Sequence, residues 1–319
     1  MTDYGHDPLF GVFITPTNQP AMQPVDLAIV ADRAGLDLAT FQDHPYQPRF
    51  HDTWTLLSYV AARTERILVS GNVLNLPLRD PAVLARSAAS LDLLSGGRFE
   101  LGIGSGGFWD AIEAMGGRRL TPGQGVQALD EAIQIIRGIW ATKEPGRLQV
   151  DGEYYQVSGA KRGPAPAHDI GVWIGAYKPR MLRLTGRAGD GWLPSLGYLK
   201  GGPSDLEEMN KHIDDSAERA GRDPRAVRRM LNISGQFTPT GRGLFSGSSQ
   251  DWAEHAAALA LTYGTSGFIL AADDPTTIQL FASEVAPAAR ELIAAERGTK
   301  NVPEQGRQRP AFQEATNDQ

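Results

Sequence analysis

The sequence predicts an α/β fold, a (β/α)8 TIM barrel that forms a single domain over residues 1–298. Short apolar runs alternate with helical patterns, and the first four runs recur about every 30 residues, the spacing that successive βαβ units require. Eight such runs occur, and eight units close a barrel. The chain has 319 residues, of which 41% are hydrophobic, so it can bury one large core.

The predicted strands are short, apolar and rich in β-compatible residues. They cover residues 10–15, 38–42, 67–74, 98–103, 170–176, 191–194, 228–236 and 267–272. The predicted helices between them begin at caps or at proline and end at stop signals such as Gly35 and Gly96. They cover residues 24–34, 53–64, 81–94, 121–141, 179–188, 204–220, 249–263 and 275–297.

Three segments fall outside this repeat. Residues 147–157 predict a β-hairpin around Asp151 and Gly152, inserted after the fourth βα unit and followed by a loop over residues 158–169. Residues 241–249 are rich in glycine and serine and predict a flexible segment placed for a lid over the strand ends. Residues 299–319 are polar and predict a flexible C-terminal tail.

Composition excludes several classes of function. A net charge of −6 without a basic stripe argues against nucleic acid as a partner, and the absence of cysteine excludes disulfides and thiolate metal sites. The six histidines show no metal-binding spacing, so no metal is expected. The longest uncharged segment, residues 256–272, is broken by turn residues, which argues against a membrane span. The N-terminus shows no signal-peptide pattern, so we expect a cytoplasmic protein.

The segment over residues 38–46 is the first candidate for chemistry. An apolar strand there ends in Asp43 and His44, and Pro45 prevents the strand from continuing. Parallel α/β folds place their sites at the C-terminal ends of strands. The alternative is an aspartate that forms a turn and a histidine on the surface.

A glycine pattern after the fourth strand has to be set aside. Gly102, Gly104 and Gly107 match the G-x-G-x-x-G pattern of dinucleotide-binding turns. That pattern belongs in the first βα unit and opens directly into a helix, whereas here it closes the fourth strand. Glycines at a strand end still allow the backbone to approach a flat or phosphorylated ligand closely.

Four motifs together resemble the bacterial luciferase-like superfamily of flavin- and deazaflavin-dependent oxidoreductases. They are Gln42-Asp43-His44-Pro45 and the segments over residues 76–81, 93–104 and 185–192, and their order covers nearly the whole chain. The resemblance implies a luciferase-like barrel with an inserted hairpin and a flavin-type ring at its C-terminal mouth. It also implies a homodimer that acts on a small-molecule substrate. A separate flavin or F420 reductase would supply the reduced cofactor.

Carried over by position, the resemblance to the branch that uses coenzyme F420 assigns the ring contacts. Asp43 and His44 would touch the ring near the reacting carbon. Asn72 and Val73 would form a non-proline cis peptide in a bulge of the third strand, pressed against the far face of the ring. Gly71 stands where a bulge needs glycine, although the ordinary alternative is a plain strand glycine.

The same resemblance assigns the remaining cofactor contacts. Ser105 and Gly106 match the contacts of the fourth strand. Ala176, Tyr177 and Lys178 match the segment that holds the cofactor phosphate at a helix N-terminus, a place that anions favour on physical grounds.

Other residues near the strand ends have weaker assignments. Tyr46, Phe108 and Trp109 are candidates for the wall of an aromatic substrate pocket, with core packing as the alternative. Arg79 and Arg98 are expected to be structural ion-pair or backbone-anchoring residues.

Two positions depart from the family pattern. Gly107 replaces the glutamate that donates a proton in some deazaflavin dehydrogenases, and Tyr177-Lys178 replaces the Gly-Gly of the phosphate segment. The fourth strand end also lacks the arginine that luciferase-type monooxygenases often use for the phosphate of FMN, which favours the deazaflavin.

The resulting hypothesis is an oxidoreductase that moves a hydride between coenzyme F420 and an organic substrate. His44 would pass the accompanying proton, and Asp43 would bond the ring edge or orient the histidine. The alternatives are an FMN-dependent monooxygenase that uses reduced flavin and oxygen, and a cofactor-binding barrel without catalysis.

Overall fold

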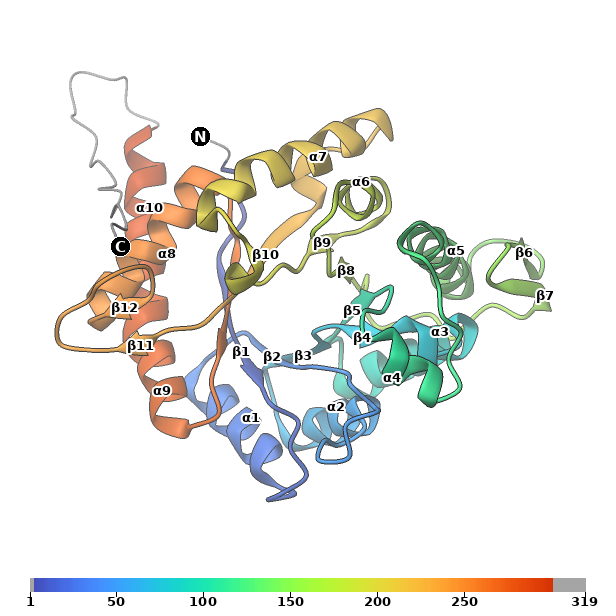
Figure 1. The fold of residues 1–319 in the computed structure, drawn as a ribbon, viewed down its shortest axis with the longest axis horizontal. Coiled ribbons are helices and arrows are strands. Elements are labelled where there is room, and N and C mark those ends of the chain that lie inside the picture. The colour runs from blue at the N-terminus through green and yellow to red at the C-terminus, as the bar shows by residue number, and fades with distance from the viewer. Residues whose placement is uncertain (1–2, 301–319) are drawn as a thin grey trace.

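The computed structural model describes residues 3–300 and confirms the (β/α)8 barrel (Figure 1). All neighbouring barrel strands are parallel, and the barrel closes where Val69 of the third strand pairs with Phe99 of the fourth. The third position is shared by β3 and β4, which are two pieces of one predicted strand. The barrel strands are β1 Leu9–Ile14, β2 Leu38–Phe41, β3 Leu68–Gly71, β4 Leu74–Asn75, β5 Phe99–Gly104, β8 Val172–Ile174, β9 Gly191–Trp192, β10 Arg228–Ile233 and β13 Gly267–Ala271.

The helices surround the barrel as predicted, with two differences. The long helices are α1 Gln23–Ala34, α2 Thr53–Arg63, α3 Pro81–Ser95, α5 Pro122–Trp140, α6 Pro179–Ala188, α7 Asp205–Arg219, α8 Ser249–Tyr263 and α10 Ala286–Lys300. A short helix after β5, α4 Trp109–Ala114, was not predicted. The predicted last helix is divided into α9 Pro275–Leu280, a π-helical turn Phe281–Val285 and α10. The predicted tail lies outside the described residues from residue 301 onward, and α10 includes its first positions.

Local sequence explains where the helices start. Asp80 caps α3 by accepting hydrogen bonds from the amides of Ala82 and Val83, and Pro81 follows at the first helical position. The α5 helix starts with a capping box in which Thr121 and Gln124 each bond the other's backbone amide. These caps fix the points at which the chain leaves the mouth of the barrel.

The strands bury side chains on both faces. Ala39 and Phe41 of β2 belong to the main apolar cluster under the helices, whereas Leu38 belongs to a second cluster with Trp173, Leu193, Met230 and Ile269. Because neighbouring strand residues point to opposite faces, this second cluster fills the inside of the barrel. It forms the floor under the C-terminal mouth.

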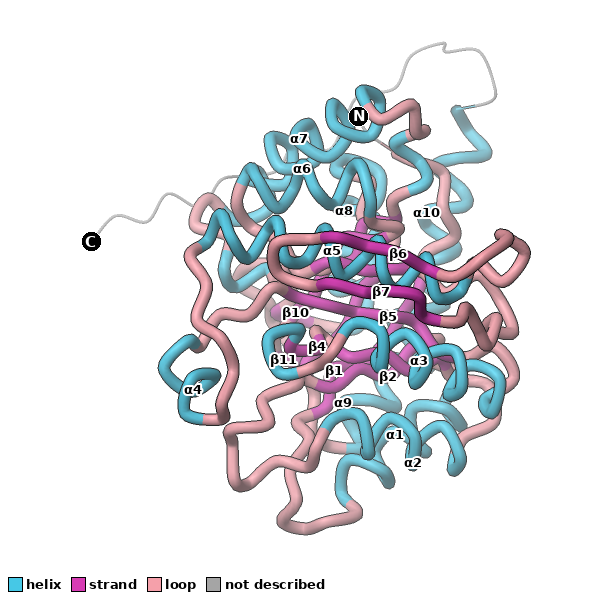
Figure 2. The backbone as a smooth tube through the Cα atoms, turned by 90° about the vertical axis from the view of Figure 1, so that its right-hand side faces the viewer, coloured by secondary structure: helices cyan, strands magenta, loops and turns pink. Residues whose placement is uncertain are grey.

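The inserted hairpin is confirmed and lies outside α5 (Figure 2). Its strands are β6 Leu148–Asp151 and β7 Gln156–Ala160, so the second strand extends further than predicted. Glu131 of α5 is buried, and its carboxylate accepts hydrogen bonds from the amides of Glu153, Tyr154 and Tyr155 at the hairpin turn. A single carboxylate therefore attaches the turn to the barrel helix.

The predicted lid is not found over the mouth. Residues 236–237 and 246–247 form a short parallel pair, β11 Gln236–Phe237 with β12 Ser246–Gly247, and Phe245 is fully buried against Trp252. Among the described residues, none of 241–249 lines the cavity at the barrel mouth. The glycines suggested mobility, but Phe245 fixes the segment to α8 through the core.

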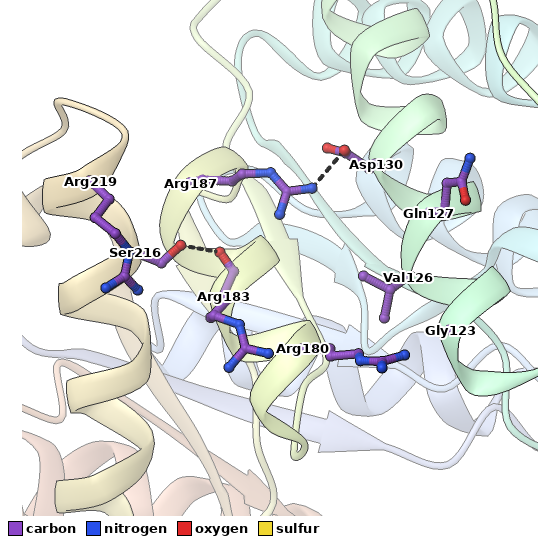
Figure 3. Close-up of a pocket in the computed structure, with 9 residues that line it drawn as sticks. All are labelled: Gly123, Val126, Gln127, Asp130, Arg180, Arg183, Arg187, Ser216 and Arg219. Atoms are coloured by element: carbon purple, nitrogen blue, oxygen red, sulfur yellow. Dashed lines mark hydrogen bonds and ion pairs between the residues drawn. The ribbon is translucent and has the colours of Figure 1, made fainter.

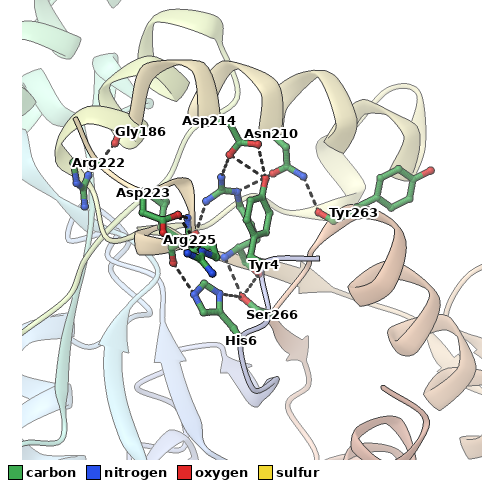
Figure 4. Close-up of polar contacts among 12 residues, drawn as sticks. Tyr4, His6, Gly186, Asn210, Asp214, Arg222, Asp223, Arg225, Tyr263 and Ser266 are labelled. Carbon is green, nitrogen blue, oxygen red and sulfur yellow. Dashed lines mark hydrogen bonds and ion pairs between the residues drawn. The ribbon is translucent and has the colours of Figure 1, made fainter. Parts of the chain in front are cut away.

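A buried arginine of β10 ties the N-terminal segment to α7, and Figure 4 shows Tyr4 of that segment beside Asp214 of α7. The Arg229 side chain is only 1% exposed, and it bonds Asn210 and Asp214 of α7. Its guanidinium lies 4.4 Å from the ring centroid of Tyr4, whose hydroxyl donates to Asp214 at 2.7 Å. The cluster therefore depends on one carboxylate that serves both Arg229 and Tyr4.

We expect Asp214→Ala to lower the free energy of unfolding by about 3 kcal/mol, because it leaves a buried guanidinium without its counter-charge. Urea denaturation followed by circular dichroism measures this. The control is Asp215→Ala on the same helix, which removes a carboxylate paired with the exposed Lys211 at 3.0 Å and should leave the midpoint unchanged. Equal effects of the two substitutions would contradict the role assigned to Asp214.

Candidate functional site

A cavity of about 600 Å³ opens at the C-terminal ends of the barrel strands. This is the expected position of a site in a parallel barrel. Nine of the predicted site residues line the cavity, namely Asp43, His44, Tyr46, Asn72, Val73, Ser105, Gly106, Phe108 and Tyr177. The remaining predicted residues, Ala176, Lys178 and Trp109, lie next to its lining and not in it.

Asp43 is held by an ion pair that the sequence did not reveal. Its side chain is fully buried; Oδ2 accepts from Arg79 Nε at 2.7 Å and from the amide of Asn75 at 2.9 Å, and Oδ1 accepts from Arg79 Nη2 at 2.8 Å. Arg79 also bonds Asp52, the cap of α2, at 3.1 Å. The structural role predicted for Arg79 is confirmed, and both Asp43 oxygens have protein partners.

His44 lies in an aromatic group on one side of the cavity. Its ring stacks on Tyr46 with centroids 5.3 Å apart and meets the edge of Phe108 at 5.1 Å. Within residues 3–300 neither ring nitrogen has a hydrogen-bond partner. Burial lowers the pKa of His44, and the Asp43 carboxylate only partly opposes this shift. At neutral pH the imidazole is uncharged, with one nitrogen able to donate and the other to accept.

The third strand breaks at a cis peptide between Asn72 and Val73, as the resemblance implied. The Asn72 side-chain amide donates to Asn232 of β10 at 2.7 Å, and Asn232 in turn donates to Ser195 at 3.1 Å. Asn232 and Ser195 line the cavity but were missed from the sequence, because they become neighbours only when the barrel closes. This amide pair holds the bulge against the opposite side of the mouth.

The glycines after the fourth strand are explained by this bulge. A Cβ at Gly102 would lie 1.9 Å from the carbonyl oxygen of Gly71, and one at Gly104 would lie 2.6 Å from Val73 Cγ2. Directly after β8, a Cβ at Gly175 would approach Val73 Cγ2 to 3.3 Å. Gly102 and Gly104 therefore serve close packing around the third strand. Their place on the fourth strand of a closed barrel confirms that the pattern is not a dinucleotide fingerprint.

The segment predicted to hold a phosphate stands at an open helix end. The α6 helix begins at Pro179 after Lys178 and has no capping side chain. The Ala176 carbonyl accepts a hydrogen bond from the Trp192 indole at 2.9 Å, and the Tyr177 hydroxyl accepts from the Ser195 amide at 2.8 Å. Pro179 has no N–H, and the amide of Met181 bonds the Lys178 carbonyl at 2.9 Å. The Arg180 amide and the exposed Lys178 side chain are therefore the groups of this segment that can bind an anion.

Two buried polar atoms at the mouth have no hydrogen-bond partner in the part of the chain that the structure describes. They are the Tyr46 hydroxyl and Asn75 Oδ1, and both residues line the cavity. Burial also raises the pKa of Tyr46, so its hydroxyl stays protonated. Because buried polar groups are nearly always paired, these atoms are suited to bond a ligand.

The cavity therefore fits a flat, polar ring system. Glycine backbone and Val73 offer a thin surface on one side, the aromatic group around His44 lies on another, and the open end of α6 suits a phosphate. Among residues 3–300 no group of acidic or histidine side chains could hold a metal ion. Over the same residues, no helix combines the length and apolar character that crossing a bilayer requires.

Comparisons with known proteins agree with this geometry. Residues 9–242 match the family model described as luciferase-like monooxygenase. An F420-dependent glucose-6-phosphate dehydrogenase from Nocardia farcinica is 33% identical over 218 residues, which cover 66% of this chain and 63% of that protein. A 5,10-methylenetetrahydromethanopterin reductase from Methanolobus tindarius is also 33% identical over 218 residues, covering 68% of this chain and 62% of that protein. The match thus spans less than two thirds of these relatives.

A solved structure confirms the fold. An F420-dependent secondary alcohol dehydrogenase in complex with an F420-acetone adduct superposes with a TM-score of 0.77 at 17% identity. The superposition covers 89% of this chain and 99% of that one.

We expect nuclear magnetic resonance titration to give His44 a pKa below the value near 6.5 of a free histidine, and His168 a pKa above it. Burial lowers the first, whereas the carboxylates of Glu100 and then Asp92 raise the second. Since the unfolded chain binds a proton at His44 more readily than the folded chain does, His44 contributes a loss of stability as the pH falls below about 6.5. A His44 that titrates above His168 would contradict this environment.

Proposed function

The chain belongs to the luciferase-like monooxygenase family, and from this we propose that it is an F420-dependent oxidoreductase that transfers a hydride between the deazaflavin and an organic substrate. The observation that carries the proposal is the position of His44 in a ring-sized cavity at the barrel mouth, uncharged and without a hydrogen-bond partner among the described residues. The name of the Nocardia farcinica relative supports the choice of F420, since that protein is described as F420-dependent.

Different residues around the cavity would bind different parts of the cofactor. Val73 and Gly106 would contact the ring faces, Ser105 its polar edge, and the open end of α6 at Tyr177 and Lys178 the phosphate. Bound there, the deazaflavin supplies two-electron hydride chemistry. Asp43 would act indirectly, because its oxygens are bonded to Arg79 and Asn75; it fixes the backbone that carries His44.

Proton transfer would be the task of His44 and Tyr46. A neutral imidazole can accept a proton from a substrate hydroxyl at one nitrogen, or release one in the reverse direction. The protonated Tyr46 hydroxyl can donate a hydrogen bond to the same substrate oxygen. These two side chains would take over the role of the proton-donating glutamate, whose position is occupied by Gly107 in this chain.

We also retain the homodimer as part of the proposal. Large apolar side chains are exposed on two neighbouring helices: Tyr59 of α2 is 46% exposed, and Val83 and Leu94 of α3 are 63% and 87% exposed. A second copy that covers this face would bury them.

We expect His44→Gln to lower the rate of the chemical step by about 100-fold while the affinity for the cofactor changes only a few-fold, because glutamine fills similar space but cannot carry a proton. Single-turnover oxidation of reduced F420 measures the rate. The control, His51→Gln, alters a nearby histidine whose Nε2 bonds the Ala21 carbonyl, and it should be close to wild type. An unchanged rate in His44→Gln would show that His44 only lines the pocket.

We expect the purified protein to bind F420 at least about tenfold more tightly than FMN, a difference of about 1.4 kcal/mol. The end of the fourth strand, Ser105-Gly106-Gly107, offers no cationic side chain for the terminal phosphate of FMN. Parallel fluorescence titrations at one salt concentration compare the two. Tighter binding of FMN, with oxygen consumed when reduced FMN is added, would instead support a two-component monooxygenase.

A further inference from the structure

A second cavity, of about 330 Å³, lies between α5, α6 and α7 on the outside of the barrel (Figure 3). Four arginines and one carboxylate line it, in a chain whose net charge is −6. We call it the arginine groove, and its residues are Gly123, Val126, Gln127, Asp130, Arg180, Arg183, Arg187, Ser216 and Arg219. The concentration of positive charge here contrasts with the acidic balance of the whole chain.

Of the four arginines in the groove, one forms an ion pair with a described residue of the protein. Arg187 pairs with Asp130 at 2.6 Å. Within residues 3–300 the side chains of Arg180, Arg183 and Arg219 make no hydrogen bond or ion pair; the nearby Asp215 is paired with Lys211, and Arg219 affects it only at longer range. These guanidinium groups are therefore available to an external anion.

Two other arginines of the same region have structural roles, and their contacts can be compared with those of the groove. Arg137 of α5 and Arg222, which follows α7, both bond Asp190, at 2.7 and 3.0 Å. Each also bonds a backbone carbonyl. In the described part of the chain, the side chains of Arg180 and Arg183 have no such contacts, so no structural role accounts for them.

The first turn of α5 lies between the arginine groove and the main cavity. Gly125 of α5 lies against Ser105, which lines the barrel mouth, and a Cβ there would be 3.4 Å from Ser105 Cβ. Two residues earlier, a Cβ at Gly123 would be 3.0 Å from Arg180 Nη1. The glycine-rich first turn of α5 therefore contacts both cavities, and Arg180 is the second residue of α6.

The arginines then continue along one side of α6. Arg180, Arg183 and Arg187 are spaced three and four residues apart, so they share a helix face and span about 10 Å. Such a row suits an extended ligand with several negative charges better than a single small anion. Glycine at position 123 leaves room for the Arg180 guanidinium at the N-terminal end of the row.

Resting on the proposed function, we propose that the arginine groove binds the oligoglutamyl tail of the deazaflavin. The ring and phosphate occupy the barrel mouth, and the chain of carboxylates leaves between the first turns of α5 and α6. The carboxylates then bond Arg180 and Arg183, with Arg219 as a further cation on the opposite wall. The groove thereby distinguishes long-tailed from short-tailed forms of the same cofactor.

The test compares a deazaflavin that carries one glutamate with one that carries a long oligoglutamyl tail, by fluorescence titration of the full chain. We expect the long-tailed form to bind about tenfold more tightly at low salt, and this advantage to shrink at high salt because partly exposed charges are screened. In Arg180→Gln/Arg183→Gln the advantage should fall below about twofold. The matched control is Arg33→Gln, an exposed arginine on α1 that should keep the full advantage.

The outcomes separate the two proposals. If both forms bind the unaltered protein equally, the tail site is overturned and the proposed function stands. If neither form binds, the proposed function fails and the tail site with it. The tail site is also overturned if the Arg180→Gln/Arg183→Gln variant still binds the long-tailed form about tenfold more tightly than the short-tailed form. Binding of the short-tailed form shows that this variant is folded.

Discussion

The buried ion pair between Asp43 and Arg79 is the interaction on which the barrel mouth depends. It joins the end of β2 to the chain that follows β4, and Arg79 extends the link to Asp52 at the start of α2. Both partners are largely withdrawn from water, so removing one would leave a buried charge without compensation. The backbone of His44 follows directly from Asp43 and is fixed by this pair, and its ring then packs against Tyr46 and Phe108.

A second constraint comes from the bulged third strand. Val73 turns toward the cavity, and the neighbouring strands meet it with glycine: Gly104 on β5 and Gly175 after β8. A side chain at Gly104 would collide with Val73, so the smooth glycine surface of the mouth and the bulge require each other. The amide pair of Asn72 and Asn232 then fixes the bulge across the barrel.

Sequence reasoning reached the parts of the structure that local patterns encode. The strand repeat, the helix caps and the hairpin all depend on residues close in the chain, and the resemblance to a known family located the cis peptide at Asn72. The parts that it missed depend on contacts between distant residues. Asn232 joins the site only through barrel closure, the partner of Asp43 lies 36 positions away at Arg79, and the glycines of the predicted lid gave no sign that Phe245 would be buried. Local sequence describes the neighbours of a residue along the chain, whereas the environments of Asn232, Arg79 and Phe245 are set by residues distant in the chain that pack against them.

The contact between Glu131 and the hairpin turn limits how the inserted hairpin can be transferred from one barrel to another. Glu131 on α5 is buried and receives three backbone amides from the turn, and Gln127 of the same helix adds a donor at 3.2 Å. Grafting the hairpin alone onto another barrel would leave these three amides without their shared acceptor. The insertion and the helix beneath it thus form one transferable unit, and a barrel that receives the hairpin needs a carboxylate at the matching position of its helix.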